Sequence, residues 1–172
     1  DAYWMIQEAI ECPDPVIFFE PKRRYWEKGV VDTSSRPETV ASSIVRRAGT
    51  DCTVVSYGPS MPVLMKAAAA AEAEGRSLEI IDLRTLSPLD IDPVLASVKK
   101  TGHLVVVSEA PREASITSEV AARVTEEAFY SLAAPVLRIA GFDTPYPPTR
   151  LEEEYLPDID KILTAVDRSL AY

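Results

Sequence analysis

Apolar and polar positions alternate regularly from about residue 41 onward, and this pattern predicts a series of strands and helices. Continuous or alternating apolar runs indicate strands, whereas apolar residues that recur every three to four positions indicate helices. The predicted strands are 43–47, 53–57, 78–83, 103–107 and 136–140, and the predicted helices are 61–74, 91–99, 115–132 and 158–171. The short polar link 48–51 between the first two strands predicts a hairpin.

After this hairpin the elements follow one another as strand and helix in strict alternation. Right-handed crossovers between such units place helices on both faces of a parallel sheet. The segment 103–107 is almost entirely apolar, as expected of a strand covered on both faces. We therefore expect an α/β fold, a three-layer sandwich with a five-stranded, mostly parallel sheet and one antiparallel edge strand.

The first forty residues follow a different pattern. Tyr3, Ile6 and Ile10 have helical spacing, Pro13 ends the helix, and 16–19 is an apolar run typical of a strand. One helix and one strand cannot cover their own apolar faces. We expect 1–20 to be the tail of another domain, 21–40 a polar connector and 41–172 the main domain. The chain also opens without Met, so we expect a piece of a longer protein.

Composition and charge narrow the range of functions that this chain can have. The formal net charge is −9, from 27 acidic and 18 basic side chains. This charge repels phosphate backbones, so no nucleic-acid partner is expected. It would suit a basic protein partner, although solubility explains it equally well. There is no apolar run of about 20 residues and no signal peptide, which predicts no membrane association and a cytoplasmic location, or the mitochondrial matrix in a eukaryote.

The residues with reactive side chains do not form a recognisable catalytic motif. Cys12 and Cys52 are far apart and cannot form a zinc site with His103, the only histidine, so free and mostly buried thiols are expected. Gly58 is expected to serve as a plain turn from strand to helix. Glu109 follows a strand, where a helix cap or a salt bridge is a more common role for a carboxylate than acid–base catalysis.

The segment 143–148 is the most unusual string in the chain. Three prolines in four positions enforce a rigid extended path, and Asp143 precedes them where a turn cap is natural. Tyr146 lies within this rigid path. Both a docking edge and a purely structural crossover are compatible with it.

Several strings together resemble a known family. The chain is similar to the C-terminal half of the beta subunits of 2-oxo acid dehydrogenases, which ends in a transketolase C-terminal-like domain, and the likeness is closest to the branched-chain type. The segments that carry it are 16–22, 80–88, 97–102, 109–111, 134–136 and 143–145. Pyruvate-type subunits share most of these strings. The equivalent domain of a transketolase or a deoxyxylulose-phosphate synthase, and a free-standing α/β binding module, remain as alternatives.

The resemblance implies a heterotetramer of two alpha and two beta subunits. Such an enzyme removes carbon dioxide from a 2-oxo acid on thiamine diphosphate, held with magnesium, and passes the acyl group to a lipoyl arm. In this family the cofactor-activating residues lie in the earlier half of the beta subunit. The resemblance therefore implies that this segment has no catalytic or cofactor-binding residue, is inactive by itself, and serves assembly with the alpha subunit and a second beta subunit.

The resemblance also implies two sites. Branched-chain members bind a structural potassium ion after the last helix of the pyrimidine-binding domain, and the matching positions are Ala9, Cys12 and Asp14. The acyltransferase core docks through a small basic subunit-binding domain, and Asp143 and the carboxylate of Tyr172 are the matching acceptors. Ser108 stands where many relatives have histidine, which weakens any role carried over to that position.

Overall fold

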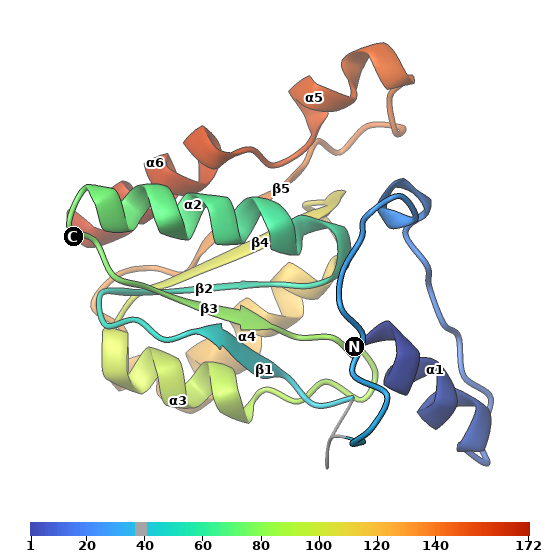
Figure 1. The fold of residues 1–172 in the computed structure, drawn as a ribbon. Coiled ribbons are helices and arrows are strands. Elements are labelled where there is room, and N and C mark those ends of the chain that lie inside the picture. Colours follow the sequence, from blue (N-terminus) through green and yellow to red (C-terminus); the bar gives the residue numbers. More distant parts are fainter. Residues whose placement is uncertain (37–40) are drawn as a thin grey trace. The chain divides into compact units, whose positions relative to one another are not determined.

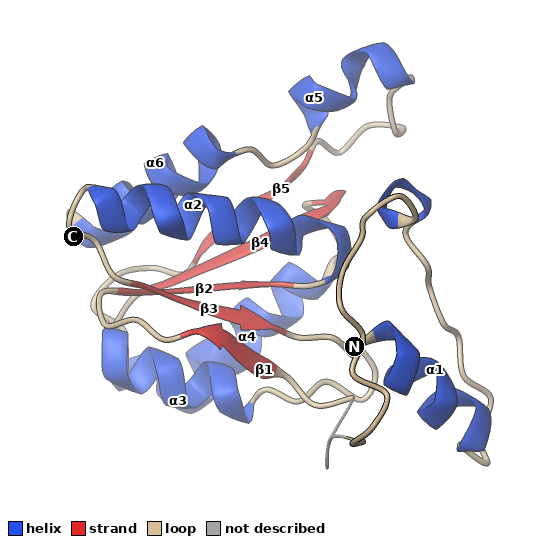
Figure 2. Ribbon diagram, in the orientation of Figure 1, coloured by secondary structure: helices blue, strands red, loops and turns tan. Residues whose placement is uncertain are grey.

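The computed structural model describes residues 1–36 and 41–172, and the chain forms two compact units, Asp1–Ser42 and Ser43–Tyr172. Residues 37–40, which belong to the expected connector, lie outside the described residues. The second unit contains a sheet between helices, as Figures 1 and 2 show. The finer division of the first unit at residue 20 remains a prediction.

The second unit is built on a five-stranded sheet with the order β1-β3-β2-β4-β5. The strands are β1 (Ile44–Arg47), β2 (Cys52–Ser56), β3 (Leu78–Asp82), β4 (Leu104–Pro111) and β5 (Leu137–Gly141). All neighbouring strands are parallel except β1, which is antiparallel to β3. The expected mostly parallel sheet with one antiparallel edge strand is confirmed.

The predicted hairpin between the first two strands is wrong, because β3 lies between them. Ile44 pairs with Asp82, and Val45 pairs with Ile81. The link 48–51 crosses the start of β3 instead of turning back on β1. The backbone N–H groups of Thr50 and Asp51 donate to the carbonyl of Ser77, at 3.1 and 2.8 Å.

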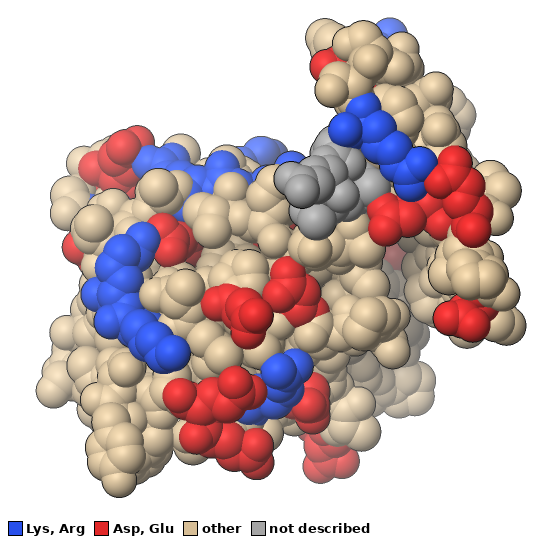
Figure 3. Space-filling model, turned by 90° about the horizontal axis from the view of Figure 1, so that it is seen from below, with Lys and Arg blue, Asp and Glu red and all other residues tan. Residues whose placement is uncertain are grey.

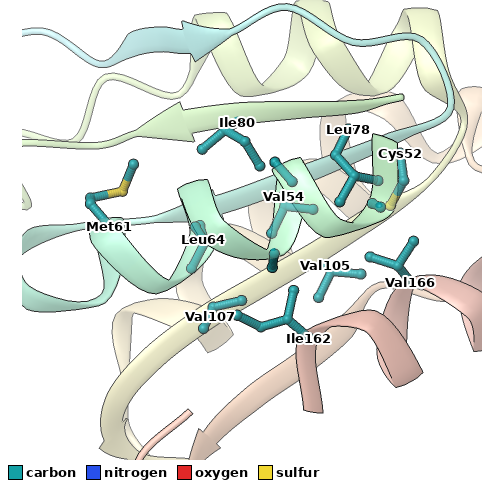
Figure 4. Packing of buried hydrophobic residues seen from close by; sticks show 13 residues of the cluster. Cys52, Val54, Met61, Leu64, Leu78, Ile80, Val105, Val107, Ile162 and Val166 are labelled. Carbon is teal, nitrogen blue, oxygen red and sulfur yellow. The ribbon is translucent and has the colours of Figure 1, made fainter. Parts of the chain in front are cut away.

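Helices cover both faces of the sheet (Figure 1). On one side lie α2 (Met61–Ala73) and α6 (Ile159–Leu170), and on the other lie α3 (Asp92–Thr101) and α4 (Ile116–Ala128). Alternate residues of each inner strand enter opposite cores: Val54 packs under α2 and α6, whereas Val55 packs under α3 and α4. Figure 4 shows the first core, where Val105 and Val107 meet Ile162 of α6. This alternation is the two-residue period of a strand buried on both faces.

Local signals explain where the helices begin and end. Gly102 ends α3 in the left-handed conformation, with φ of +73°, and its N–H donates to the carbonyl of Val98. Asp158 caps α6, since its side chain accepts from the N–H of Lys161 at 2.7 Å. The alanine-rich face of α2 buries Ala67, Ala68 and Ala71, which lets this helix pack closely on the sheet. Helix α4 ends at Ala128, before the predicted end at 132, and a 3₁₀ turn, Phe129–Ser131, follows it.

The first unit contains the predicted helix but not the predicted strand. Helix α1 spans Ala2–Glu11, and Trp4 donates through Nε1 to the carbonyl of Asp32 at 3.0 Å. The apolar run 16–19 has no strand assignment, because the described part of this unit offers no second strand to pair with it. Ile17 and Phe19 are 80% and 86% exposed. No described residue of 1–36 is buried, so this unit has no core within the described chain.

Candidate functional site

The edge of the sheet formed by the carboxyl ends of the strands is the first place to look for a ligand site. The chain leaves β2 toward β3 on one side and later returns to β4 on the other, so β2 and β4 flank the topological switch point. Ser56 ends β2 there, Tyr57 follows it, and Ser108 lies in the last part of β4. Their hydroxyl groups bond within the chain, since Ser56 Oγ donates to the carbonyl of Val107 at 2.7 Å and the Tyr57 hydroxyl lies 2.9 Å from Ser108 Oγ.

The hydroxyl groups at the switch point therefore join β2 to β4 through hydrogen bonds within the chain. Ser108 Oγ also accepts from the N–H of Ala110 at 3.0 Å, so this side chain caps the bend of β4. Gly58 has a φ of +55°, the left-handed conformation that glycine adopts without strain, which confirms its expected role as a turn residue. These residues provide no cation, and their hydroxyl groups bond to one another or to the backbone, so they do not fit a diphosphate group.

The two other residues considered for catalysis are far apart. Glu109 lies near the end of β4 and is half-buried. His103 precedes β4 at the opposite edge of the sheet, where its Nδ1 lies 3.1 Å from Ser169 Oγ of α6. An acid–base pair of Glu109 and His103 is therefore excluded. Among residues 1–36 and 41–172, no three His, Cys, Asp or Glu side chains are grouped closely enough to hold a metal ion.

Asp143 lies at the carboxyl end of the sheet, where it ties two loops together. Its Oδ1 accepts from the N–H of Glu113 at 3.0 Å, which links the turn after β5 to the turn after β4. The proline segment that follows packs by its aromatic side chains: the ring of Tyr155 lies 5.2 Å from that of Tyr146 and 6.0 Å from that of Phe142. Phe142 and Tyr146 nevertheless keep more than half of their surface exposed. The segment thus exposes aromatic side chains at the carboxyl end of the sheet.

The other expected docking residue is at the opposite edge of the sheet. Tyr172 ends the chain after α6, next to Ser169, which contacts His103 before β4. Helix α6 runs back along the sheet for twelve residues, about 18 Å, between the two edges. The structure therefore does not bring Asp143 and Tyr172 together, and one arginine cannot pair with both.

The three residues of the expected potassium site lie at the end of α1. Pro13 has no N–H group, so it cannot donate to the carbonyl of Ala9 as the next residue of a helix would. Cys12 adopts an extended conformation, with φ of −64° and ψ of +131°, and Asp14 is exposed. A backbone carbonyl that lacks its usual helical N–H donor, beside a carboxylate, offers the oxygen ligands that a hard cation takes. The donor chemistry fits potassium, and the site itself remains a prediction.

Both cysteines are free, but only one is buried. Cys52 is fully buried at the start of β2, and burial raises the pKa of its thiol to about 12. Cys12 is exposed, so the expectation that both thiols are mostly buried is wrong for it. Cys12 belongs to the first unit, which has no core in the described chain.

A shallow groove between α4 and β5 was not anticipated. Its lining residues are mostly small or polar: Ser118, Ala121, Ala122, Thr125, Glu126 and Arg138. Arg138 donates through Nη1 to Ser118 Oγ at 2.6 Å and to the carbonyl of Arg112 at 3.3 Å. The groove continues past Phe129 and Tyr130, which are 60% and 100% exposed. Arg138 interrupts the otherwise apolar strand β5, and this is the sequence signal that β5 is an edge strand.

Charges of both signs are mixed on the side of the sheet covered by α3 and α4, as Figure 3 shows. A face of this kind does not present the continuous basic surface that nucleic acid requires. Within the described ranges, no helix is long and apolar enough to span a bilayer.

Comparison with known families shows which family this chain belongs to. The family model "Transketolase, C-terminal domain" matches residues 42–162. The chain belongs to this family. The five-stranded sheet with its antiparallel edge is therefore a transketolase C-terminal domain, and the matched range begins one residue before the second unit.

Curated relatives of this transketolase C-terminal domain include beta subunits of two dehydrogenases. The chain is 62% identical over 172 residues to the pyruvate dehydrogenase E1 component subunit beta of Leifsonia xyli subsp. xyli, covering all of this chain and 51% of the relative. It is 52% identical over 171 residues to the 3-methyl-2-oxobutanoate dehydrogenase subunit beta of Mycobacterium tuberculosis, covering 99% of this chain and 49% of the relative. The chain thus spans about half the length of these relatives.

Solved structures agree on the fold. A split-gene transketolase, described as an inactive beta4 tetramer, matches with a TM-score of 0.70 and 26% identity, over 84% of this chain and 46% of the other. The 2-oxoglutarate:ferredoxin oxidoreductase of Magnetococcus marinus matches with a TM-score of 0.51 and 13% identity, over 75% of this chain and 19% of the other, which supports the fold alone.

Proposed function

We propose that the chain is the C-terminal part of the beta subunit of a thiamine-diphosphate-dependent 2-oxo acid dehydrogenase. The observation that carries this proposal is the 62% identity along the whole chain to such a subunit. Thiamine diphosphate with magnesium supplies the decarboxylation chemistry in the whole enzyme. The switch-point residues of this chain do not fit a diphosphate. We propose that the chain contributes assembly and docking surfaces to the whole enzyme and is inactive by itself.

The exposed apolar residues of the first unit support this assignment. Ile17, Phe19, Trp26 and Val30 are each at least 80% exposed, and large apolar side chains left exposed in this number suit contact with another surface. We propose that residues 1–20 complete a pyrimidine-binding domain formed by the remainder of a longer beta subunit. The helix α1 and the apolar run 16–19 would then pack against that remainder.

The acyl substrate has two candidates. The resemblance of the sequence motifs favours a branched-chain 2-oxo acid, which the relative from M. tuberculosis supports at 52% identity. The relative from L. xyli, at 62% identity, favours pyruvate.

A single reconstitution experiment tests the enzyme proposal and separates the substrates. The complete reading frame that contains this chain is expressed with its alpha subunit, and carbon dioxide release is measured with pyruvate and with 3-methyl-2-oxobutanoate. We expect thiamine-diphosphate-dependent release from the complex and none from the 172-residue chain. A complex that is fully loaded with cofactor but inactive on both 2-oxo acids would contradict the proposal.

The partners follow from the same assignment. We propose that the chain assembles with an alpha subunit and with a second beta subunit, since the related split-gene transketolase is described as a tetramer of its own beta chain. We also propose that Asp143 and the carboxylate of Tyr172 each accept arginine side chains of the basic subunit-binding domain of the acyltransferase core. Because these residues lie at opposite edges of the sheet, they would make two separate contacts.

Calorimetric titration with that basic domain tests the docking proposal. At low salt we expect binding that weakens as salt is added. Asp143→Asn and a short C-terminal extension that displaces the carboxylate should each weaken binding, and their effects should add because the sites are far apart. Unchanged affinity in both variants would show that docking uses another surface.

The potassium proposal concerns the end of α1. We propose that the carbonyls of Ala9 and Cys12 and the side chain of Asp14 contribute oxygen ligands to a potassium ion in the longer beta subunit. Its thermal stability should be higher in potassium chloride than in sodium chloride at equal ionic strength, and Asp14→Ala should abolish the difference. Equal melting temperatures in both salts would refute the site.

A further inference from the structure

We infer that Tyr155 is a positioning residue for the docking of this chain to its basic partner, because it fixes the turn that carries Asp143. This inference rests on the proposed contact between Asp143 and an arginine of that partner, and it adds the residue that holds the carboxylate in one orientation. Tyr155 is 5% exposed, so it acts through Asp143 and not by touching the partner.

Asp143 lies at the centre of a tight turn after β5, the docking turn (142–144). The N–H of Thr144 donates to the carbonyl of Phe142 at 2.8 Å, which closes this three-residue turn. Oδ1 of Asp143 accepts from the N–H of Glu113 at 3.0 Å. Within the part of the chain that the structure describes, Oδ2 accepts no hydrogen bond. The exposed carboxylate thus keeps one oxygen for a partner, in a direction that the turn determines.

Tyr155 contacts the docking turn directly. Its hydroxyl donates to the same carbonyl of Phe142 at 3.3 Å. Its ring lies between those of Phe142 and Tyr146, with centroid distances of 6.0 and 5.2 Å. Phe142 and Tyr146 are 60% and 55% exposed, so the buried ring of Tyr155 supplies the packing beneath the turn. Loss of Tyr155 would remove both this packing and a hydrogen bond.

Gly141, the last residue of β5, leaves the space that Tyr155 occupies. A Cβ atom at this position would lie 2.5 Å from Cζ and 2.6 Å from Cε1 of the Tyr155 ring. These distances are shorter than van der Waals contact, so a larger residue at this position must displace the ring. The ring of Tyr155 is therefore fitted closely over the end of β5.

Lys161 of α6 holds the short helix that carries Tyr155. This helix, α5 (Glu152–Tyr155), lies in the segment between β5 and α6 (Figure 1). Lys161 Nζ donates to the carbonyls of Glu154 and Leu156, at 3.1 and 2.9 Å. Carbonyls at the end of a helix lack N–H partners, and a cation satisfies them. Contacts therefore run from α6 through Tyr155 to the docking turn.

A fixed turn matters because an arginine pairs with a carboxylate through directed hydrogen bonds. The guanidinium group presents its N–H groups in a planar fork, which the carboxylate must meet at a matching angle. Ordering a mobile side chain on binding costs affinity, whereas a side chain already held in the bound geometry avoids this cost. A buried residue that holds the turn therefore contributes to affinity without any contact of its own.

Calorimetric titration of the 172-residue chain with the basic subunit-binding domain of the acyltransferase core tests the inference. Tyr155→Leu should weaken binding about 10-fold, because the docking turn loses its packing and a hydrogen bond. Tyr155→Phe keeps the ring over Gly141 and should stay within about threefold of the unmodified chain. Val98→Ala, a buried truncation in α3 on the other face of the sheet, is the matched control and should leave the affinity unchanged.

Combined variants separate positioning from a general loss of structure. Tyr155→Leu and Asp143→Asn should have less than additive effects on the binding free energy, since Tyr155 acts through the Asp143 carboxylate. Tyr155→Leu and the C-terminal extension should be additive, because the carboxylate of Tyr172 lies at the opposite edge of the sheet. Gly141→Ala should reproduce the loss. Combined with Tyr155→Leu it should add nothing, because leucine is too short to meet the new methyl group.

Circular dichroism melting confirms that each variant is folded. If Tyr155→Leu unfolds the chain, Lys161→Met replaces it, because it removes the cation that holds α5 and leaves the aromatic ring in the sequence. Lys161→Met also makes the chain more acidic. The weaker binding that we expect of this variant therefore cannot come from its net charge, which favours a basic partner.

Several results would overturn the inference. Affinity that Asp143→Asn lowers and Tyr155→Leu leaves unchanged removes the role of Tyr155, while docking stands. Additive losses from these two variants, or an equal loss in Val98→Ala, show that Tyr155 does not act through the carboxylate. An unmodified chain that fails to bind the domain refutes the docking proposal together with this inference. The dehydrogenase assignment is tested separately, by the reconstitution with the alpha subunit.

Discussion

A buried carboxylate shows what single residues contribute to this domain. Glu79 of β3 is 4% exposed and forms an ion pair with Lys100 of α3. Burial acts to raise the pKa of Glu79, but hydrogen bonds from Lys100, Ser97 and the N–H of Gly49 outweigh it, so the pKa is below its ordinary value. This side chain therefore connects β3 and α3 with the segment 48–51 that follows β1.

Glu79→Gln should destabilise the second unit by about 1.5–3 kcal/mol at pH 7, because the charged hydrogen bonds are lost. The pKa of Glu79 is lower in the folded than in the unfolded chain, where it is about 4.3. Its stabilising contribution is thus complete above that value and is lost as pH falls through the lower, folded pKa. Urea unfolding at pH 7 and at pH 3.5 measures this difference.

The control for this experiment is Lys99→Ala, an exposed neighbour of Lys100 on α3, which should change stability little at either pH. A loss in Glu79→Gln that is equally large at both pH values would show that the ionised carboxylate is not the stabilising group.

At the scale of elements, the crossing from β1 to β2 depends on one glycine. A Cβ atom on Gly49 would lie 2.5 Å from the carbonyl oxygen of Leu78, and closer still to two other backbone atoms of β3. The link passes so near to β3 because Thr50 and Asp51 bond to Ser77, which directs the chain across the sheet. The strand order β1-β3-β2 requires this close passage.

Gly49→Ala should therefore destabilise the domain by about 1–3 kcal/mol, the usual cost of forcing an extra methyl group into a packed site. Backbone atoms are the obstacle, so neighbouring side chains cannot relieve the clash by rotating. Thermal melting measures the effect. Gly29→Ala is the control, because a Cβ there has no neighbour within 4 Å, and an equal loss in both variants would refute the argument.

At the scale of the whole molecule, the two units differ in how their side chains are buried. The unit Ser43–Tyr172 has two cores, one on each face of its sheet. The described residues of 1–36 include no buried side chain. Stability is expected to follow this division, since local opening is easiest where few apolar groups are buried.

Limited trypsin digestion of the 172-residue chain should therefore cut first at Lys22, Arg23 and Arg24 and leave the second unit intact. Intact-mass measurement over time would identify the surviving fragment. Simultaneous loss of both units would show that residues 1–36 are as stably folded as the sheet domain.

The sequence alone determined the elements of this domain and its class. Apolar periodicity is a local property, so it correctly indicated five strands and four main helices, and the strand–helix alternation predicted the layered sheet. The resemblance of its motifs to beta subunits agrees with the family match. The turn at Gly58 and the caps at Gly102 and Asp158 were also predictable, because each depends on neighbouring residues only.

The tertiary structure decided which distant segments meet. It placed β3 between β1 and β2, and it left the run 16–19 without a strand partner. It separated Asp143 from Tyr172 and brought Arg138 beside Ser118. Strand pairing and interelement contacts depend on residues far apart in the chain, and the periodicity of one segment holds no information about its neighbours in space. The physical reason is that a sequence pattern shows only that a strand or helix has an apolar face that must be buried. Which other element covers that face is decided by the packing of the whole domain.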